Sequence, residues 1–197
     1  MIFVLLAANI LIFLTMTAQT GAMSWNARTL FDWGGNLGLA SLHGQPWRIV
    51  TATFLHASLS HIFGNMVLLL ITGSFLERKL GSVRFVLVYL ACGIAGGVLS
   101  AWSHPNVVGV GASGAIAGLL GAMIALYATR RAPEVSGAWI AQTFVINALY
   151  SFAPNVDWLA HLGGFLAGLG LGALLATRMP AMEARALPDR TESSGRE

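Results

Sequence analysis

The sequence predicts an all-α, polytopic membrane protein with a bundle of six transmembrane helices. Hydrophobic residues make up 56% of the 197 residues and charged residues only 10%, whereas soluble domains carry about 25% charged residues. Mean hydropathy is +0.71, so much of the surface must face lipid. The net charge of +3 is small, and the basic residues lie in short clusters between apolar runs. That pattern is typical of membrane topology rather than of nucleic-acid binding, so we expect a lipid bilayer and no nucleic acid as a partner.

A helix needs about 20 mostly apolar residues to cross the hydrocarbon core. Residues 1–27 hold no Asp, Glu, Lys or Arg, and Ile2 to Ala18 form the first predicted span. A secretory signal peptide is the competing interpretation. We favour a retained helix, because no basic segment precedes the run and five more apolar segments follow it.

A stretch rich in Gly and Trp, residues 20–55, separates the first span from the second. Its glycines and Pro46 interrupt it too often for a transmembrane helix. Tryptophans gather at membrane interfaces, so we expect a loop lying in the interfacial region. The second span then covers about residues 56–76 and ends at the charged run Glu77-Arg78-Lys79.

Residues 85–129 contain no formal charge, which fits two crossings. The turn-forming cluster at residues 103–106 divides them, giving a third span at 85–102 and a fourth that begins near Gly111. The fifth and sixth spans cover about 138–152 and 158–176. Residues 1–177 are thus one membrane domain, and 178–197 form a polar, charged tail.

The basic residues also predict the orientation. With the N-terminus in the cytoplasm, nine of the eleven Lys and Arg residues fall on the cytoplasmic side. That asymmetry is what the positive-inside rule expects, so we predict cytoplasmic N- and C-termini. The single cysteine, Cys92, lies in an apolar run and is expected to be a small packing residue.

Polar residues gather at the starts of the second, fourth and sixth spans, which lie at one outer level in this topology. His61 and Asn65 are four residues apart and share a helix face. Ser113 follows a glycine-rich lead-in at a helix start, and His161 stands at the beginning of the sixth span. Ionisable groups inside a membrane indicate function by default, because burying them is costly.

Together these residues can carry out acyl transfer. A serine hydroxyl needs a base within hydrogen-bond reach, and His161 can serve Ser113 in that role. The developing oxyanion needs donors, which His61, Asn65 and the Ser113 backbone N–H can provide. Asp157, one turn before His161, either completes a triad or caps the sixth helix; we favour the cap. The GxxxG spacings Gly114–Gly118 and Gly164–Gly168 indicate helix packing.

Five motifs in order resemble those of the rhomboid family of intramembrane proteases. They are Trp47-Arg48, His61-Ile62-Phe63-Gly64-Asn65, Glu77-Arg78, Gly111-Ala112-Ser113-Gly114 and Ala160-His161-Leu162-Gly163-Gly164. The resemblance, over about residues 1–177, implies a serine endopeptidase with a Ser113–His161 dyad. His61 and Asn65 would stabilise the oxyanion, and Trp47, Arg48, Glu77, Arg78, Gly111 and Gly114 would be structural motif residues.

The resemblance also implies a six-helix bundle with a shortened fourth helix and a cavity that opens outward. Substrates would be single-span membrane proteins, cut near the outer end of their helix, and no metal or organic cofactor is expected. No further helix or soluble domain is visible, which favours the bacterial form in the inner membrane. Some relatives have an aromatic residue four positions after the serine, near the catalytic histidine; here it is Ala117.

Two other functions compete with proteolysis. A non-catalytic relative would bind membrane clients, but it has no need of Ser113 with His161. A small transporter would use His161 and Asn65 in a polar pathway, yet its polar groups should run through the full membrane depth. Here they cluster at one end of the spans.

Overall fold

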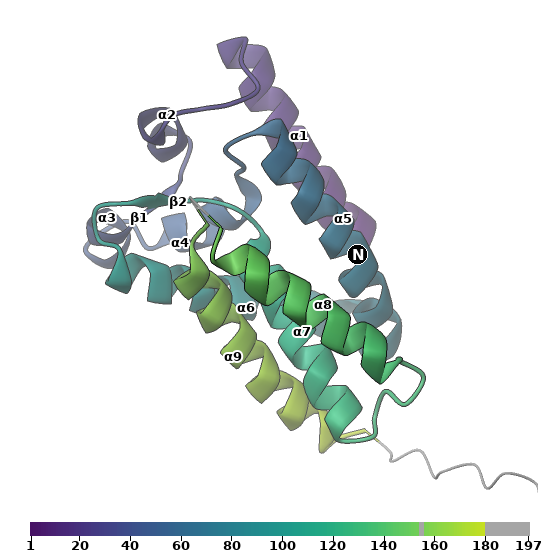
Figure 1. The fold of residues 1–197 in the computed structure, drawn as a ribbon. Helices are drawn as coiled ribbons and strands as arrows, with labels where there is room; N and C mark the ends of the chain where they lie inside the picture. The colour runs from purple at the N-terminus through teal and green to yellow at the C-terminus, as the bar shows by residue number, and fades with distance from the viewer. Residues whose placement is uncertain (154–155, 180–197) are drawn as a thin grey trace, which may run out of the picture.

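The computed structural model describes residues 1–153 and 156–179 and is built almost entirely of helices (Figure 1). Six longer helices match the six predicted spans in order, with ends that differ by a few residues. They are α1 (Ile2–Thr20), α5 (Leu59–Leu80), α6 (Ser82–Ser103), α7 (Ser113–Ala128), α8 (Gly137–Ser151) and α9 (Trp158–Ala176). The all-α membrane bundle is therefore confirmed. The predicted tail lies outside the described residues except for Arg178 and Met179.

The six helices differ in length. Helices α1, α5, α6 and α9 are long and apolar enough to cross a membrane. Helix α7 has 16 residues and α8 has 15. At 1.5 Å per residue α7 is about 24 Å long, less than the ~30 Å hydrocarbon core, so the fourth helix is indeed short.

One predicted end was wrong. We expected the second span to end at Glu77-Arg78-Lys79, but α5 continues through these residues to Leu80 and ends at Gly81, whose φ is 79°. The charged run lies at the end of the helix, where its side chains reach polar partners. The charged run therefore lies within the last turn of the helix and does not end it.

The stretch between α1 and α5 contains short elements in place of a span. They are α2 (Ala27–Asp32), β1 (Asn36–Leu37), α3 (Gly38–Leu42), α4 (Trp47–Thr51) and the 3-10 turn η1 (Ala52–Phe54). The ribbon formed by β1 and β2 (Val108–Gly109) is antiparallel and was not predicted. Two residues per strand are too few to give an alternating sequence pattern. Because β2 precedes α7, the ribbon ties this region to the start of α7 (Figure 1).

Helices α7 and α9 pack backbone to backbone along their whole length, a contact we call the glycine seam. An ideal Cβ on Gly164 would lie 1.9 Å from the Gly114 carbonyl oxygen, and one on Gly168 would lie 1.9 Å from that of Gly118. A Cβ on Gly118 would also lie 2.2 Å from Cβ of Cys92, a buried packing residue as predicted. The glycines therefore set the spacing and register of the two helices.

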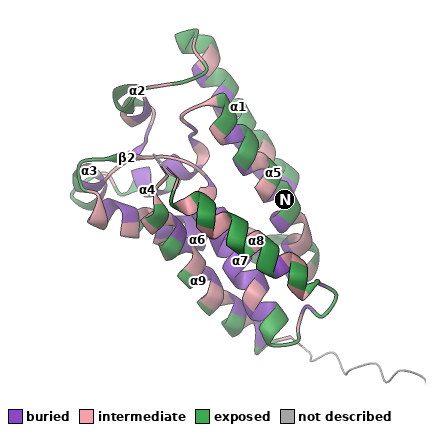
Figure 2. Cartoon of the chain, viewed as in Figure 1, coloured by how far each residue is buried: buried purple, intermediate pink, exposed green. Residues whose placement is uncertain are grey.

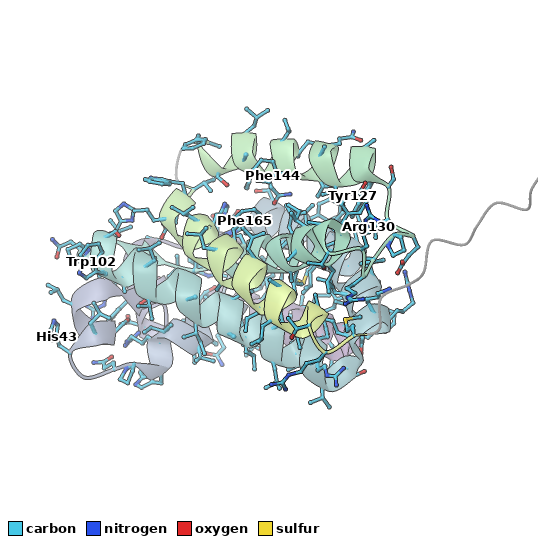
Figure 3. The ribbon with its side chains drawn as sticks, turned by 90° about the horizontal axis from the view of Figure 1, so that it is seen from below. His43, Trp102, Tyr127, Arg130, Phe144 and Phe165 are labelled. Atoms are coloured by element: carbon cyan, nitrogen blue, oxygen red, sulfur yellow. The ribbon has the colours of Figure 1, made fainter. Side chains whose placement is uncertain are left out.

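The environments of α7 and α8 are opposite. Most residues of α7 are buried, and α5, α6, α8 and α9 all contact it. Ile140 is the one buried residue of α8 among those described, and the helix appears mainly exposed in Figure 2. Its contact with α9 includes the ring pair Phe144–Phe165, with centroids 5.5 Å apart (Figure 3).

Candidate active site

A cavity of about 1130 Å³ lies at the end of the bundle that carries the β1–β2 ribbon. Its lining comes from α5, α6, α7, α8 and α9, from the segment that precedes α7 and from the short elements between α1 and α5. The lining includes every residue predicted for the chemistry and both motif glycines: His61, Asn65, Gly111, Ser113, Gly114 and His161. Residues from three separate predicted spans therefore meet in one cavity.

Ser113 is the first residue of α7, and its side chain is half-buried. The first N–H groups of a helix have no partner within it, so the Ser113 N–H points out of the helix start. Gly111 just before it has φ +126°, and a Cβ there would lie 2.7 Å from Nε2 of His61. Both the backbone angle and the close imidazole therefore require glycine at position 111.

His161 lies in the first turn of α9 and is only 8% exposed. The glycine seam brings it toward Ser113, because a Cβ on Gly114 would lie 3.1 Å from the Ala160 carbonyl oxygen. In the part of the chain that the structure describes, Ser113 and His161 line the same cavity without a hydrogen bond between them. Catalytic hydrogen bonds are often long without substrate and shorten when it binds.

The imidazole of His161 has one hydrogen-bond partner that the sequence did not indicate. Ser151, the last residue of α8, places its Oγ 2.6 Å from Nδ1 of His161. The same Oγ lies 2.7 Å from the carbonyl oxygen of Asn147. A signal was present, since Ser151 ends the fifth span close to where the sixth begins. Ala117, the position that is aromatic in some relatives, is a buried residue of α7 and offers no aromatic surface.

Asp157 is the N-cap of α9, as we favoured. Its Oδ1 accepts a hydrogen bond from the Ala160 N–H at 3.0 Å, and its Oδ2 accepts one from Ser100 Oγ of α6. Nδ1 of His104 lies 3.6 Å from Oδ1. The carboxylate therefore joins the start of α9 to the end of α6, and it makes no described hydrogen bond to the His161 ring.

His61 and Asn65 face the cavity from the first two turns of α5. The Ala57 N–H donates to Nδ1 of His61 at 3.5 Å, which favours a neutral ring with its hydrogen on Nε2, toward Gly111. Asn65, 7% exposed, donates one amide hydrogen to the His61 carbonyl at 2.9 Å and keeps a second. His56 precedes α5 and is buried, with its ring centroid 5.0 Å from that of His61.

Arg48 lies outside the cavity, in α4, and is buried within the loop region. Its guanidinium donates to the carbonyl oxygens of Phe31 and Gly35, the second at 3.2 Å, and to the side chain of Gln45. The guanidinium also lies 3.7 Å from the Phe31 ring centroid and 4.5 Å from that of Trp47. Arg48 thus holds α2, β1 and α4 together, with Trp47 stacked on it.

Glu77 and Arg78 lie at the opposite end of α5 from His61. The Ile2 N–H donates to Glu77 at 2.8 Å, and the Ser82 hydroxyl also donates to it. Glu77 therefore joins the starts of α1 and α6 to α5. Arg78 lines a second cavity of about 460 Å³, beside Trp139 of α8. Neither residue touches the cavity that holds Ser113.

In the described ranges, no cluster of three or more His, Cys, Asp or Glu side chains has a geometry suited to a metal ion. The polar groups that line the cavity are hydroxyls, imidazoles, amides and the Asp157 carboxylate. Apolar helices long enough to span a bilayer enclose this polar site, and the protein is an integral membrane protein.

Comparison with known proteins identifies the family. The family model described as Rhomboid domain matches residues 43–178. The chain is 35% identical over 176 residues to the rhomboid protease GluP of Bacillus subtilis, covering 88% of this chain and 34% of that protein. It is 33% identical over 178 residues to rhomboid-like protease 3 of Toxoplasma gondii, covering 83% of this chain and 65% of that protein.

RHOMBOID-like protein 1 of Arabidopsis thaliana is 38% identical over 141 residues, which cover 68% of this chain and 36% of that protein. The chain thus matches between about a third and two thirds of the length of these relatives. The protein belongs to the rhomboid family, and the relatives it matches include named proteases.

Proposed function

We propose that this protein is an intramembrane serine endopeptidase that cleaves membrane proteins in or near their transmembrane segments, with a Ser113–His161 dyad. The observation that carries the proposal is the meeting of Ser113, His161, His61 and Asn65 in one cavity. A packing role for these four residues explains neither their common depth nor the space left between them. The family relationship supports the same chemistry.

The proposed reaction begins when Nε2 of His161 takes the proton of Ser113 Oγ, which attacks the scissile carbonyl carbon. The oxyanion then accepts hydrogen bonds from the Ser113 N–H, from Nε2–H of His61 and from the free amide hydrogen of Asn65. The protonated His161 delivers its proton to the leaving amine. Water from the cavity attacks the acyl-enzyme, His161 again acts as base, and Ser113 is released.

The expected substrates are single-span membrane proteins. Helices α5 and α8 border the cavity from two sides, with Phe63 and Val67 on one and Ile146 and Tyr150 on the other. Among the described residues these two helices make little contact with each other. A substrate helix would approach between them from the lipid. The charge distribution supports cytoplasmic termini and a site toward the outer face. The membrane we propose is a bacterial inner membrane.

A non-catalytic, client-binding rhomboid-like protein is the second candidate, because the same cavity can hold a peptide without cutting it. The hydrogen bond that fixes His161 through Ser151 favours the enzyme. A binding protein gains nothing from an oriented imidazole beside a serine at a helix start.

The test compares the purified protein with Ser113→Ala and His161→Ala on a single-span substrate in proteoliposomes, with cut positions read by mass spectrometry. Ser103→Ala and His43→Ala are matched controls, since neither residue lines the cavity. We expect cleavage near one end of the substrate helix, lost in both site variants and kept in both controls. Cleavage by Ser113→Ala, or none by the folded wild type on several substrates that it binds, would contradict the proposal.

A further inference from the structure

The contacts of His161 raise the question of what orients its ring. A general base needs a lone pair on the nitrogen that faces the nucleophile, and a neutral imidazole has one on only one of its two nitrogens. In serine hydrolases with a triad, a carboxylate on the other nitrogen selects this tautomer. In this protein the nearest carboxylate, Asp157, is committed to Ala160 and Ser100.

The hydrogen bonds of Ser151 determine the direction of each donor. A carbonyl oxygen only accepts, so the contact of 2.7 Å with Asn147 uses the single hydrogen of the Ser151 hydroxyl. The oxygen of that hydroxyl must then accept in its contact of 2.6 Å with Nδ1 of His161. With the hydroxyl hydrogen on the Asn147 carbonyl, the hydrogen of the neutral imidazole lies on Nδ1 and the lone pair on Nε2.

We propose that Ser151 is a positioning residue for catalysis, which holds the His161 ring and selects the tautomer with a free Nε2. The inference rests on the proposed function, in which His161 is the base. It also gives the ring a fixed partner in a chain whose residue 117 is alanine rather than an aromatic residue. A hydroxyl bonded to its own helix takes the place that a carboxylate occupies in a triad.

Two substitutions separate the hydroxyl from the packing at this position. Ser151→Ala removes the oxygen, and Ser151→Thr keeps it while adding a methyl group. We expect Ser151→Ala to lower kcat by about 10-fold to 100-fold, less than the 10²–10⁴-fold that general base catalysis contributes in full. KM should not change, since Ser151 contacts the base rather than the substrate. Ser151→Thr should recover most of kcat, and Ser103→Ala should behave as wild type.

A second measurement reads the tautomer directly, by nitrogen-15 NMR of the histidine-labelled protein. Signals that vanish in His161→Ala identify this ring, and we expect its hydrogen on Nδ1 in wild type and in Ser151→Thr. In Ser151→Ala the two tautomers should mix. A wild-type ring with its hydrogen on Nε2 would overturn the inference, as would equal losses of kcat in the Ala and Thr variants.

The two proposals fail in different ways. If the wild-type protein cuts no substrate, the proposed function fails, while the NMR tautomer still decides the role of Ser151. If His161 is required for cleavage and Ser151→Ala cleaves at the wild-type rate, the role of Ser151 is wrong and the protease stands.

Discussion

The glycine seam between α7 and α9 and the helix α8 differ in almost every respect, although both contribute to the same cavity. In the seam, backbone touches backbone at Gly114, Gly118, Gly164 and Gly168, and little movement is possible without a clash. Helix α8 buries mainly Ile140, and most of its apolar side chains face outward. The seam fixes the backbone positions of the two reacting residues, whereas α8 contributes a border of the cavity and the Ser151 hydroxyl that contacts the His161 ring.

This difference assigns separate tasks to the two regions. Catalysis tolerates little displacement of reacting groups, and a misplacement of about 1 Å can cost 10²-fold in rate. A rigid seam meets that demand without large side chains. A helix with few buried contacts can move at smaller cost in free energy, which suits a border that substrates must pass.

The largest effect should come from adding one methyl group to the seam. Gly168→Ala places a Cβ 1.9 Å from the Gly118 carbonyl oxygen, so the helices must separate. We expect a loss of at least about 3 kcal/mol in stability, at the upper end for overpacking, and loss of cleavage. Gly170→Ala is the control on the same helix, with nothing within 4 Å of its added Cβ. Thermal unfolding in detergent measures both, and equal unfolding temperatures would contradict the rigid seam.

The second-largest effect should come from a substitution at Gly111, in the segment that precedes Ser113. Gly111→Ala forces a side chain into a backbone region that L-residues avoid and pushes it against the ring of His61. We expect about a 10²-fold fall in kcat, because the serine and one oxyanion donor shift together. Gly64→Ala is the control, since Gly64 lines the same cavity and its new Cβ meets nothing within 4 Å. A Gly111→Ala enzyme of normal kcat would show that the position of the lead-in is unimportant.

A matched pair of leucines compares the two regions directly. Leu119 of α7 has no exposed surface, and Leu149 of α8 is 71% exposed. We expect Leu119→Ala to cost on the order of 2 kcal/mol in stability, through lost packing around a cavity. Leu149→Ala should change stability by less than about 0.5 kcal/mol. Equal losses in unfolding experiments would mean that α8 packs as firmly as α7.

The smallest effect should come from the ion pair that ties the segment before α8 to α5. Lys79 Nζ lies 2.9 Å from Glu134 Oε1. Partial burial raises the pKa of the Glu134 carboxyl, but the hydrogen bond from Lys79, a backbone hydrogen bond and the charge of Lys79 together hold that pKa below its ordinary value.

A depressed carboxyl pKa means that the pair stabilises the fold above the ordinary pKa of glutamate and ceases to do so as the pH falls through the lower, folded value. Because the pair is partly exposed, Glu134→Gln should cost less than about 1 kcal/mol near neutral pH. Wild type and variant should converge in unfolding temperature at acidic pH. A difference that grows as the pH falls would contradict this account.

The sequence allowed the helices and the main residues of the cavity to be predicted, since both follow from local patterns. Apolar runs give the spans, and the positions of Ser113, His61 and His161 at three span starts give their common level. The cap role of Asp157 also follows from local chemistry, because the spacing to Ala160 belongs to one helix turn.

The missed features all depend on contacts between different elements. The pairing of Asn36 with Gly109 in the β1–β2 ribbon leaves no pattern in either strand. The bonds of Ser100 with Asp157 and of Ser151 with His161 require the tilt of neighbouring helices, which the sequence of each helix does not contain. Serine is common in membrane helices for packing, so its type alone could not identify Ser151.

The shortness of α7 has a consequence for hydration. If its far end lies level with the membrane boundary, a helix of about 24 Å leaves its first residue about 6 Å beneath the opposite surface of a ~30 Å core. Ser113 would then lie beneath the membrane surface, at the bottom of a water-filled cavity that ends at the start of α7. Helical peptide bonds are shielded by their own hydrogen bonds, so the substrate helix must unwind locally before its peptide bond reaches Ser113. The 16-residue length of α7 thus sets the depth to which water must enter the membrane and the depth at which a substrate helix must unwind.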